Sequence, residues 1–383
     1  MHNRVLYLYF ILILITGVPL RSQNKLASDT TTTDKVSILK RIYQYFEESN
    51  EEKDDKHFDF SIIGGPHYSS DTKLGLGLVA SGLYRLDRSD KSISPSNVSL
   101  YGDITTTGAY VIGISGNTIF PKMKYRIDAD MYLSYCPSKY WGIGYNNGRN
   151  DYYSEYDNLQ IEVKVDFLKK VAQGLYVGVT GNVRNAQGKS FEDITLLEGR
   201  DPESTVAGMG LILSYDSRDF IPNPYKGIYA KVEHIIYPKF LSTTPGSDKT
   251  EVIFRYYQQA WKGAVIALDM QGIISSNNTA WNMLAQAGSS HQMRGYFAGQ
   301  YRDRNLLQSQ VELRQRVYRR NGVVIWAGAG NVFPKFKDFK WDQTLPTFGF
   351  GYRWEFKNRV NVRLDYGIGK GQSAFYFNIN EAF

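Results

Sequence analysis

The sequence predicts an all-β protein, a single transmembrane antiparallel β-barrel of about 16 strands with a short N-terminal helical or disordered segment. Three observations support this prediction. From about Phe58 onward, apolar and polar residues alternate with the period of a strand. Aromatic residues make up 14% of the chain beside 35 glycines, a composition typical of strands and turns. After the first residues there is no run of about 18 apolar residues, so no spanning helix is expected, whereas barrel strands need only about ten alternating residues.

Residues 1–22 have the form of a cleavable signal peptide. Arg4 precedes an apolar stretch from Val5 to Ile15, and the small and polar residues that follow predict cleavage near Ser22. A transmembrane anchor is the competing interpretation. Cys136 is the only cysteine, which excludes an intrachain disulfide and a thiol cluster for a metal.

Residues 23–57 differ in composition from the rest and predict a periplasmic leader with a short amphipathic helix and a charged linker. Apolar residues recur at helical spacing at Val36, Leu39, Ile42, Tyr43 and Phe46. Asp34 is suited to cap this helix, and the charged run from Glu47 to Lys56 indicates a linker. The segment is a partner-binding helix, a plug or a loosely ordered leader.

Residues 58–383 predict the outer-membrane barrel. In "LLQSQVELRQRV" one face is apolar and consists of Leu307, Val311, Leu313 and Val317. The other face is polar and consists of Gln308, Gln310, Glu312, Arg314 and Arg316. "TFGFGYRWEF" and "NVRLDYGI" repeat the pattern, and about sixteen such segments follow one another. A lipid-facing exterior around a wet lumen fits faces of this kind better than the dry core of a soluble sandwich.

The connections between these segments alternate in length. They are long after Cys136, Asn185, Pro238, Ser275 and Phe333, and short at "KG" from Lys262 and "RRNG" from Arg319. Long outer loops and short periplasmic turns would produce this order. With the signal peptide, it predicts the outer membrane of a Gram-negative bacterium, with membrane lipid as a partner. The net charge of +7 is interspersed, and no basic stripe indicates nucleic-acid binding.

Several segments together resemble the barrel of the BamA/TamA-type outer-membrane assembly superfamily, the bacterial surface antigen family. They are "SYDSRDFIPNPYKGIYAKVE", "WNMLAQAGSSHQMRGYFAGQYRDRN", "QSQVELRQ" and the final "GFGYRWEFKNRVNVRLDYGIGKGQSAFYFNINEAF". The resemblance covers residues 58–383 and is strongest from Ser214. It implies that the sixth outer loop folds back into the lumen, with Arg294 as docking cation, Gly295 in a tight turn and Tyr296 as packing aromatic. Glu312 matches an acidic partner of that cation.

The chain departs from the family pattern in two places. Where the family has an aromatic-x-Asp-x-Gly strand, this chain reads "WAGAGNVF", with Gly328 at the aspartate position. Asp365 is a candidate replacement, and Arg353 and Arg363 are further candidate lumen partners. About 35 residues separate the signal from the first strand, which leaves no room for a periplasmic POTRA domain in this chain.

The first and last strands are expected to form a weak lateral seam. Gly64, Gly65 and Pro66 lower the pairing strength of the first strand, because Pro lacks an amide donor and Gly destabilises strands. At the other end, "FYFNINEAF" resembles the C-terminal signal of outer-membrane barrels. Its apolar face is expected to include Phe375, Phe377 and Phe383. A poorly paired edge can accept another strand by β-augmentation.

Catalytic readings of the sequence are weak, and no enzyme, metal or cofactor is expected. Asp216 and Asp219 stand among turn-forming residues, which favours a structural turn. His67, Ser69 and Asp71 invite a hydrolase interpretation, but one short hairpin does not easily bring a nucleophile, base and carboxylate together.

These observations favour a non-enzymatic barrel that is accessory to outer-membrane protein insertion or translocation. Its partners would be other outer-membrane assembly proteins or unfolded barrel substrates. The alternative is a passive channel or structural scaffold that has lost the insertase role. A third hypothesis is an interaction module that uses the helix from Val36 to Phe46.

Overall fold

A computed structural model describes residues 59–69, 72–87, 96–221, 223–357 and 359–383. The expected signal peptide and leader lie outside these residues, as does Asp71. No helix in the described ranges combines the length and apolar character that a membrane span requires.

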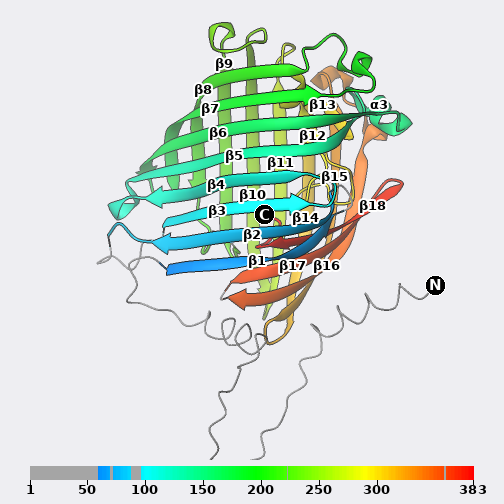
Figure 1. Ribbon diagram of the computed structural model, residues 1–383. Coiled ribbons are helices and arrows are strands. Elements are labelled where there is room, and N and C mark those ends of the chain that lie inside the picture. Colours follow the sequence, from blue (N-terminus) through cyan, green and yellow to red (C-terminus); the bar gives the residue numbers. More distant parts are fainter. Residues whose placement is uncertain (1–58, 70–71, 88–95, 222, 358) are drawn as a thin grey trace, which may run out of the picture. The chain divides into compact units, whose positions relative to one another are not determined.

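Sixteen antiparallel strands form one sheet that curves into a nearly closed barrel, so the predicted fold class is confirmed (Figure 1). The strands are β1 (Asp59–Ser69), β2 (Lys73–Tyr84), β3 (Ser96–Thr105), β4 (Tyr110–Ile119), β5 (Tyr125–Tyr140), β6 (Ser154–Ala172), β7 (Leu175–Lys189), β8 (Glu203–Asp216), β9 (Gly227–Tyr237), β10 (Ser247–Trp261), β11 (Ala264–Ser275), β14 (Asn305–Tyr318), β15 (Asn321–Phe333), β16 (Leu345–Lys357), β17 (Val360–Gly369) and β18 (Gln372–Ile379). Each pairs with the next in this order.

Period-two patterning decides which side chains face outward. In β8, Met209 and Leu211 are 75% and 69% exposed on the outer surface, while Val206 and Ile212 are buried. In β14 the expected split holds, since Val311 is exposed and its neighbour Glu312 is fully buried. An apolar outer face around a polar interior is the arrangement of a membrane barrel.

The connections segregate by length. The long ones follow β5, β7, β9, β11 and β15, and because neighbouring strands are antiparallel, all of them lie at one end of the barrel. They contain α3 (Tyr145–Asn150) and the 3₁₀ turns η2 (Ile194–Leu197), η3 (Lys239–Leu241), η4 (Trp281–Met283), η5 (Phe336–Asp338) and η6 (Trp341–Gln343). The predicted short turns lie at the opposite end, where η1 (Pro121–Met123) precedes β5. The β2–β3 connection at residues 85–95 and the β8–β9 turn at residues 217–226 are longer exceptions there.

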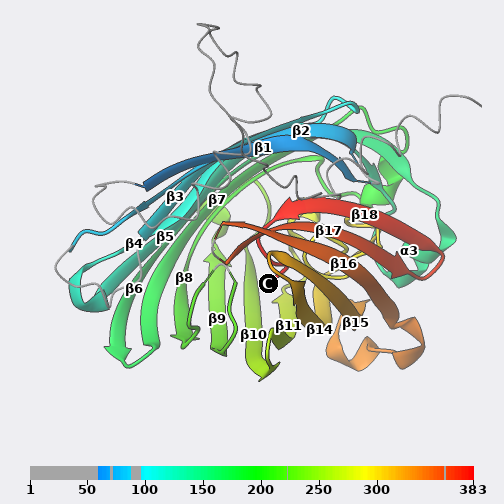
Figure 2. The same cartoon turned by 90° about the horizontal axis from the view of Figure 1, so that it is seen from below.

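The barrel closes where β1 meets β18. The two strands lie side by side, yet no run of strand pairing joins them in the residues that the structure describes (Figure 2). Gly64, Gly65 and Pro66 lie in β1 and pair on its other side with Leu78, Gly77 and Leu76 of β2.

Candidate functional site: the docked sixth loop and the seam

The connection from β11 to β14, residues 276–304, is called loop six here, and much of it is buried inside the barrel. It contains η4 and the small hairpin of β12 (Ala285–Ala287) and β13 (Tyr301–Asp303). Its apolar residues pack with the barrel wall in a buried cluster that includes Met293, Tyr296, Tyr301 and Leu345. The β5–β6 connection covers it, since Gln300 Nε2 donates to Gly148 O at 3.0 Å.

Arg294 lies at the tip of loop six and is fully buried. Its Nη2 pairs with Glu312 of β14, and its Nη1 lies 2.7 Å from Asp365 Oδ2 of β17. Its guanidinium stacks over the ring of Trp326 at 3.6 Å. Its backbone oxygen accepts a hydrogen bond from Thr347 Oγ1 at 2.5 Å. Loop six is therefore attached at this residue to four successive strands, β14 to β17.

The next two residues, for which the family resemblance implies a tight turn and a packing aromatic, approach β17 closely. Gly295 has a φ of +107°, and a Cβ there would lie 2.8 Å from backbone atoms of Gly367 and Gly369. Its amide donates to Tyr376 Oη at 3.0 Å. The Tyr296 hydroxyl donates to Pro346 O at 2.6 Å and accepts from the amide of Lys370 at 2.8 Å. A side chain at Gly295 would therefore push the loop off the wall.

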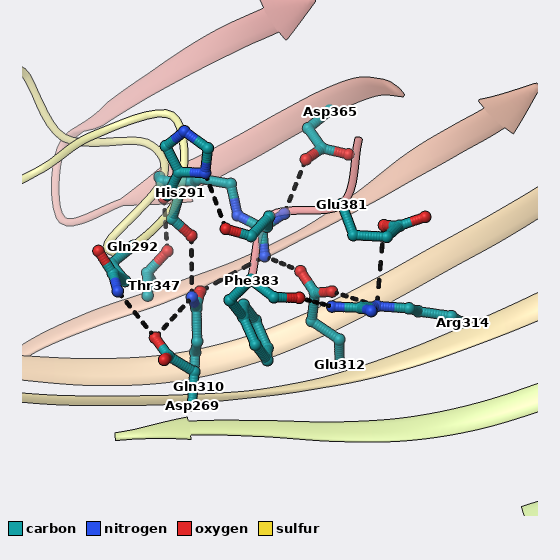
Figure 3. A network of polar contacts seen from close by, with 12 residues as sticks. Asp269, His291, Gln292, Gln310, Glu312, Arg314, Thr347, Asp365, Glu381 and Phe383 are labelled. Carbon is teal, nitrogen blue, oxygen red and sulfur yellow. Dashed lines mark hydrogen bonds and ion pairs between the residues drawn. The ribbon is translucent and has the colours of Figure 1, made fainter. Parts of the chain in front are cut away.

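Around Arg294 lies a connected group of buried charges, the lumen ion cluster. Its members are Arg294, Glu312, Arg314, Arg353, Arg363, Asp365 and Glu381, several of which Figure 3 shows. Asp365 accepts from Arg353 Nη1 at 2.6 Å and Arg363 Nη1 at 2.9 Å, and Glu312 accepts from Arg314 Nε at 2.9 Å. Breaking one buried pair of this kind typically costs 3–5 kcal/mol, because a desolvated charge is left behind.

Every residue singled out for loop docking therefore lies in one place. Loop six and β14 supply the expected docking residues, which are Arg294, Gly295, Tyr296 and Glu312. The lumen ion cluster contains the secondary candidates, which are Arg353, Arg363 and Asp365. Gly328 does face this region: a Cβ there would lie 2.8 Å from Gln310 Cβ. Asp365 supplies the carboxylate that Gly328 lacks.

The end of the described chain turns into the lumen, which corrects one sequence prediction. Phe383 was expected on the outer face of the last strand, but it is 7% exposed and packs with Tyr257 and Ala267 inside the barrel. The cause is Asn380, whose φ of +69° ends β18 and redirects the chain. Asn tolerates this left-handed region better than other residues with a side chain beyond Cβ. Figure 2 places the C-terminal end within the ring of strands.

Residues 380–383, called the tail here, bind the wall with both side chains and backbone. Glu381 accepts from Arg353 Nε at 2.8 Å and from Asn361 Nδ2 at 2.6 Å. The backbone oxygen of Phe383 accepts from Arg314 Nη2 at 3.0 Å. The Nδ1 atom of His291, in loop six, lies 2.7 Å from Ala382 O. Because a carbonyl oxygen only accepts, this nitrogen carries the hydrogen and donates it. Loop six and the tail thus hold one another.

Sequence reasoning missed Glu381, His291, Thr347 and Trp326 as members of this site. A signal was available for Glu381: an extended last strand would place it on the same outward face as Phe375, Phe377 and Ile379, where a carboxylate would meet lipid. Phe375 and Phe377 do lie in β18, the strand that borders the seam.

The residues of the hydrolase interpretation are described only in part, since Asp71 lies outside the described residues. His67 contacts Asp103 on β3. Among the described residues, no three His, Cys, Asp or Glu side chains are grouped as metal ligands. Asp216 pairs with Arg218 at 2.7 Å and Asp219 with Arg359 at 2.8 Å, so both lie in ion pairs at a turn.

The sequence gives no match to protein-family models or to curated proteins. Solved structures do share the fold. BamA from Haemophilus ducreyi lacking POTRA domains 1–3 is 11% identical, with a TM-score of 0.55 over 83% of this chain and 69% of that one. CdiB from Acinetobacter baumannii is 12% identical, with a TM-score of 0.56 over 85% and 60%. CdiB from Escherichia coli is 11% identical, with a TM-score of 0.52 over 90% and 70%.

These likenesses establish the fold. The resemblance to BamA/TamA-type barrels is confirmed at that level. This chain spans between 60% and 70% of the length of the three structures.

Proposed function

We propose that this chain is an outer-membrane barrel that assists the insertion of other outer-membrane proteins, and that the seam between β1 and β18 is where a substrate strand pairs. Its location would be the outer membrane of a Gram-negative bacterium, reached with the N-terminal signal peptide. The BamA-like and CdiB-like barrel fold supports the location, and the family resemblance supports the assembly role. The partners would be unfolded barrel proteins or other assembly proteins.

The unpaired seam is the observation that carries this proposal. β1 and β18 are neighbours without a shared ladder in the described ranges, and both belong to a wall whose outer face is apolar. Each unsatisfied backbone group in hydrocarbon costs several kcal/mol, so an incoming strand that satisfies such groups would be strongly favoured. Pro66 lies in β1, and proline is found on edge strands because it lacks an amide donor.

The tail helps to keep this edge open. β18 has only eight residues, because the chain leaves the sheet after Ile379, whereas β1 has eleven. The strand cannot lengthen along β17 without pulling Glu381 from Arg353 and Asn361. A last strand of eight residues therefore lies beside a first strand of eleven.

A cysteine lock tests the seam. In a Cys136→Ala background, Ile62→Cys on the outer face of β1 is combined in turn with Phe375→Cys, Phe377→Cys or Ile379→Cys on β18. The matched control joins Ile62→Cys to Ala80→Cys, the residue opposite it in the β1–β2 register. All variants should migrate as folded barrels in unheated gels.

Oxidation of a seam pair should abolish support for the levels of other outer-membrane proteins in depleted cells, and a reductant should restore it, whereas the control lock should have no effect. The proposal would be wrong if an oxidised seam pair still maintained normal levels of other outer-membrane proteins. Steady single-channel conductance together with normal levels of those proteins after depletion would favour the passive channel instead.

A further inference from the structure

A cavity of about 190 Å³ lies inside the barrel at the end opposite loop six. The β10–β11 turn, the adjoining ends of β14 to β17, the tail and residues Asn223 and Tyr225 of the β8–β9 turn surround it. Its charged lining consists of Arg314, Arg316, Arg320, Arg353, Glu355 and Glu381. Four guanidinium groups and two carboxylates line it, and Glu312 and Asp365 outside the lining pair with Arg314 and Arg353.

The rim of this cavity is fixed by contacts across the barrel. Arg359, in the β16–β17 connection, donates from Nη2 to Asn223 O at 2.6 Å and pairs with Asp219 at 2.8 Å. Its guanidinium also lies 4.1 Å from the centre of the Tyr225 ring. The β8–β9 turn is thus held against the far wall, so the cavity has a built edge.

The two carboxylates of the lining are already engaged. Glu355 pairs with Arg316 and accepts from the amide of Arg359 at 3.0 Å. Glu381 binds Arg353 and Asn361. The guanidinium of Arg320 has neither an ion pair nor a hydrogen bond to any residue that the structure describes. Arg320 is therefore the member of the charged lining whose positive charge is left over.

Two buried donors have the same deficit. Arg314 Nη1 and Arg353 Nη2 are buried and lack a hydrogen-bond partner among the described residues, although both side chains are more than nine-tenths buried and line the cavity. A buried charged donor that stays unsatisfied is costly. Both nitrogens lie behind the cavity surface, so an anion in the cavity gains them as donors when the two side chains turn toward it.

We propose that this cavity binds a phosphate group. Guanidinium forks match the oxygen spacing of phosphate and donate in pairs, with bonds that are stronger because both partners are charged. The group could arrive as free phosphate or as the headgroup of a phospholipid, and the chemistry of recognition is the same. The cavity shares Arg314, Arg353 and Glu381 with the lumen ion cluster, but this inference goes beyond the proposed function because it involves no substrate strand and no pairing at the seam.

The test uses the full chain folded in a zwitterionic detergent, titrated calorimetrically in phosphate-free buffer. One arm adds inorganic phosphate, and the other adds a short-chain phosphatidylglycerol below its micelle concentration. Arg320→Gln should weaken binding at least tenfold. Arg319→Gln is the matched control, because that neighbouring guanidinium lies over the Tyr318 ring and is not part of the lining.

Binding in the first arm assigns the site to free phosphate, and binding in the second arm alone assigns it to a lipid headgroup. Absence of binding in both arms, or equal affinity in the Arg320→Gln variant and its parent, overturns the proposal. Unheated gel migration shows that each variant is folded, so a null result is not a folding failure. The measurement involves no insertion assay, and it fails or succeeds separately from the seam test.

Discussion

Arg294 Nη1 and Asp365 Oδ2 lie 2.7 Å apart, although 71 residues separate them in the chain. This contact stands in for the carboxylate that the family pattern places at Gly328 on β15. Gly328 pairs with Gln310 and Thr347, whereas Asp365 reaches the same guanidinium from β17. The anchor of loop six therefore lies one strand away from β18 and the seam.

Arg294→Ala should release loop six from the wall. The substitution leaves the buried carboxylates Glu312 and Asp365 with one cation fewer, and breaking such pairs costs about 3–5 kcal/mol. Limited proteolysis should cut within residues 276–304, and the folded barrel should lose resistance to heating before electrophoresis. Arg304→Ala on the same loop, which removes a side-chain hydrogen bond to Asn277 and touches no member of the lumen ion cluster, is the control. Unaltered protease protection and heat resistance would count against docking through Arg294.

Asp365→Asn should destabilise the barrel more than Glu312→Gln. Asp365 pairs with three guanidinium groups, those of Arg294, Arg353 and Arg363, whereas Glu312 pairs with two. We expect a loss of about 3–5 kcal/mol in the unfolding free energy for Asp365→Asn. Urea unfolding in detergent measures both variants, and a larger loss for Glu312→Gln would contradict this ranking.

The barrel was predictable because its signal repeats in every strand. Each of the strand segments that the sequence analysis used, such as "LLQSQVELRQRV", carries the alternation independently, so errors at single residues do not change the fold. The long connections were predictable for the same reason, since they interrupt that alternation. The loop-docking residues were found through the family motif, and their contacts follow from it.

The rest of the site depends on geometry that spacing along the chain does not encode. Whether Asp365 reaches Arg294 is decided by the curvature of β14 to β17 and by the depth to which loop six enters. The prediction for Phe383 was wrong because a period of two holds only for extended backbone. Asn380 adopts a left-handed conformation, so the alternation of faces does not continue to Phe383. His291 gave no signal at all, because its partner Ala382 binds it through a backbone oxygen.

Asn380→Val should free the tail. A β-branched residue resists the positive φ of this position by roughly 1–2 kcal/mol, whereas Asn380→Gly should keep the turn. In a Cys136→Ala background, Ala382→Cys reports the change, because residue 382 is buried. Its thiol should react at least several-fold faster in the valine variant than in the glycine variant. Equal labelling rates would show that Asn380 does not hold the tail inside.

Protonation of His291 should destabilise the docked state. Burial lowers the pKa of His291 to about 4, and the nearby Arg363 guanidinium is the next largest cause of this lowering. The hydrogen bond to Ala382 acts in the opposite direction and raises the pKa. Arg255 and Arg294 add to the lowering. In the unfolded chain the group titrates near pH 6.5, so between pH 6.5 and about pH 4 the unfolded state binds a proton that the folded state does not. Stability is therefore fully present above pH 6.5 and falls as the pH drops.

Linkage puts this loss at about 2 kcal/mol between pH 7 and pH 5. His291→Gln is the variant to compare, because its amide can still donate to Ala382 O but has no proton to gain. Urea unfolding measures the unfolding free energy of parent and variant at both pH values. The change with pH in the variant is subtracted from the change in the parent, so that the titration of all other groups cancels. The parent should lose about 2 kcal/mol more than the variant on acidification. An identical pH dependence in the two proteins would mean that His291 does not stay neutral in the folded barrel.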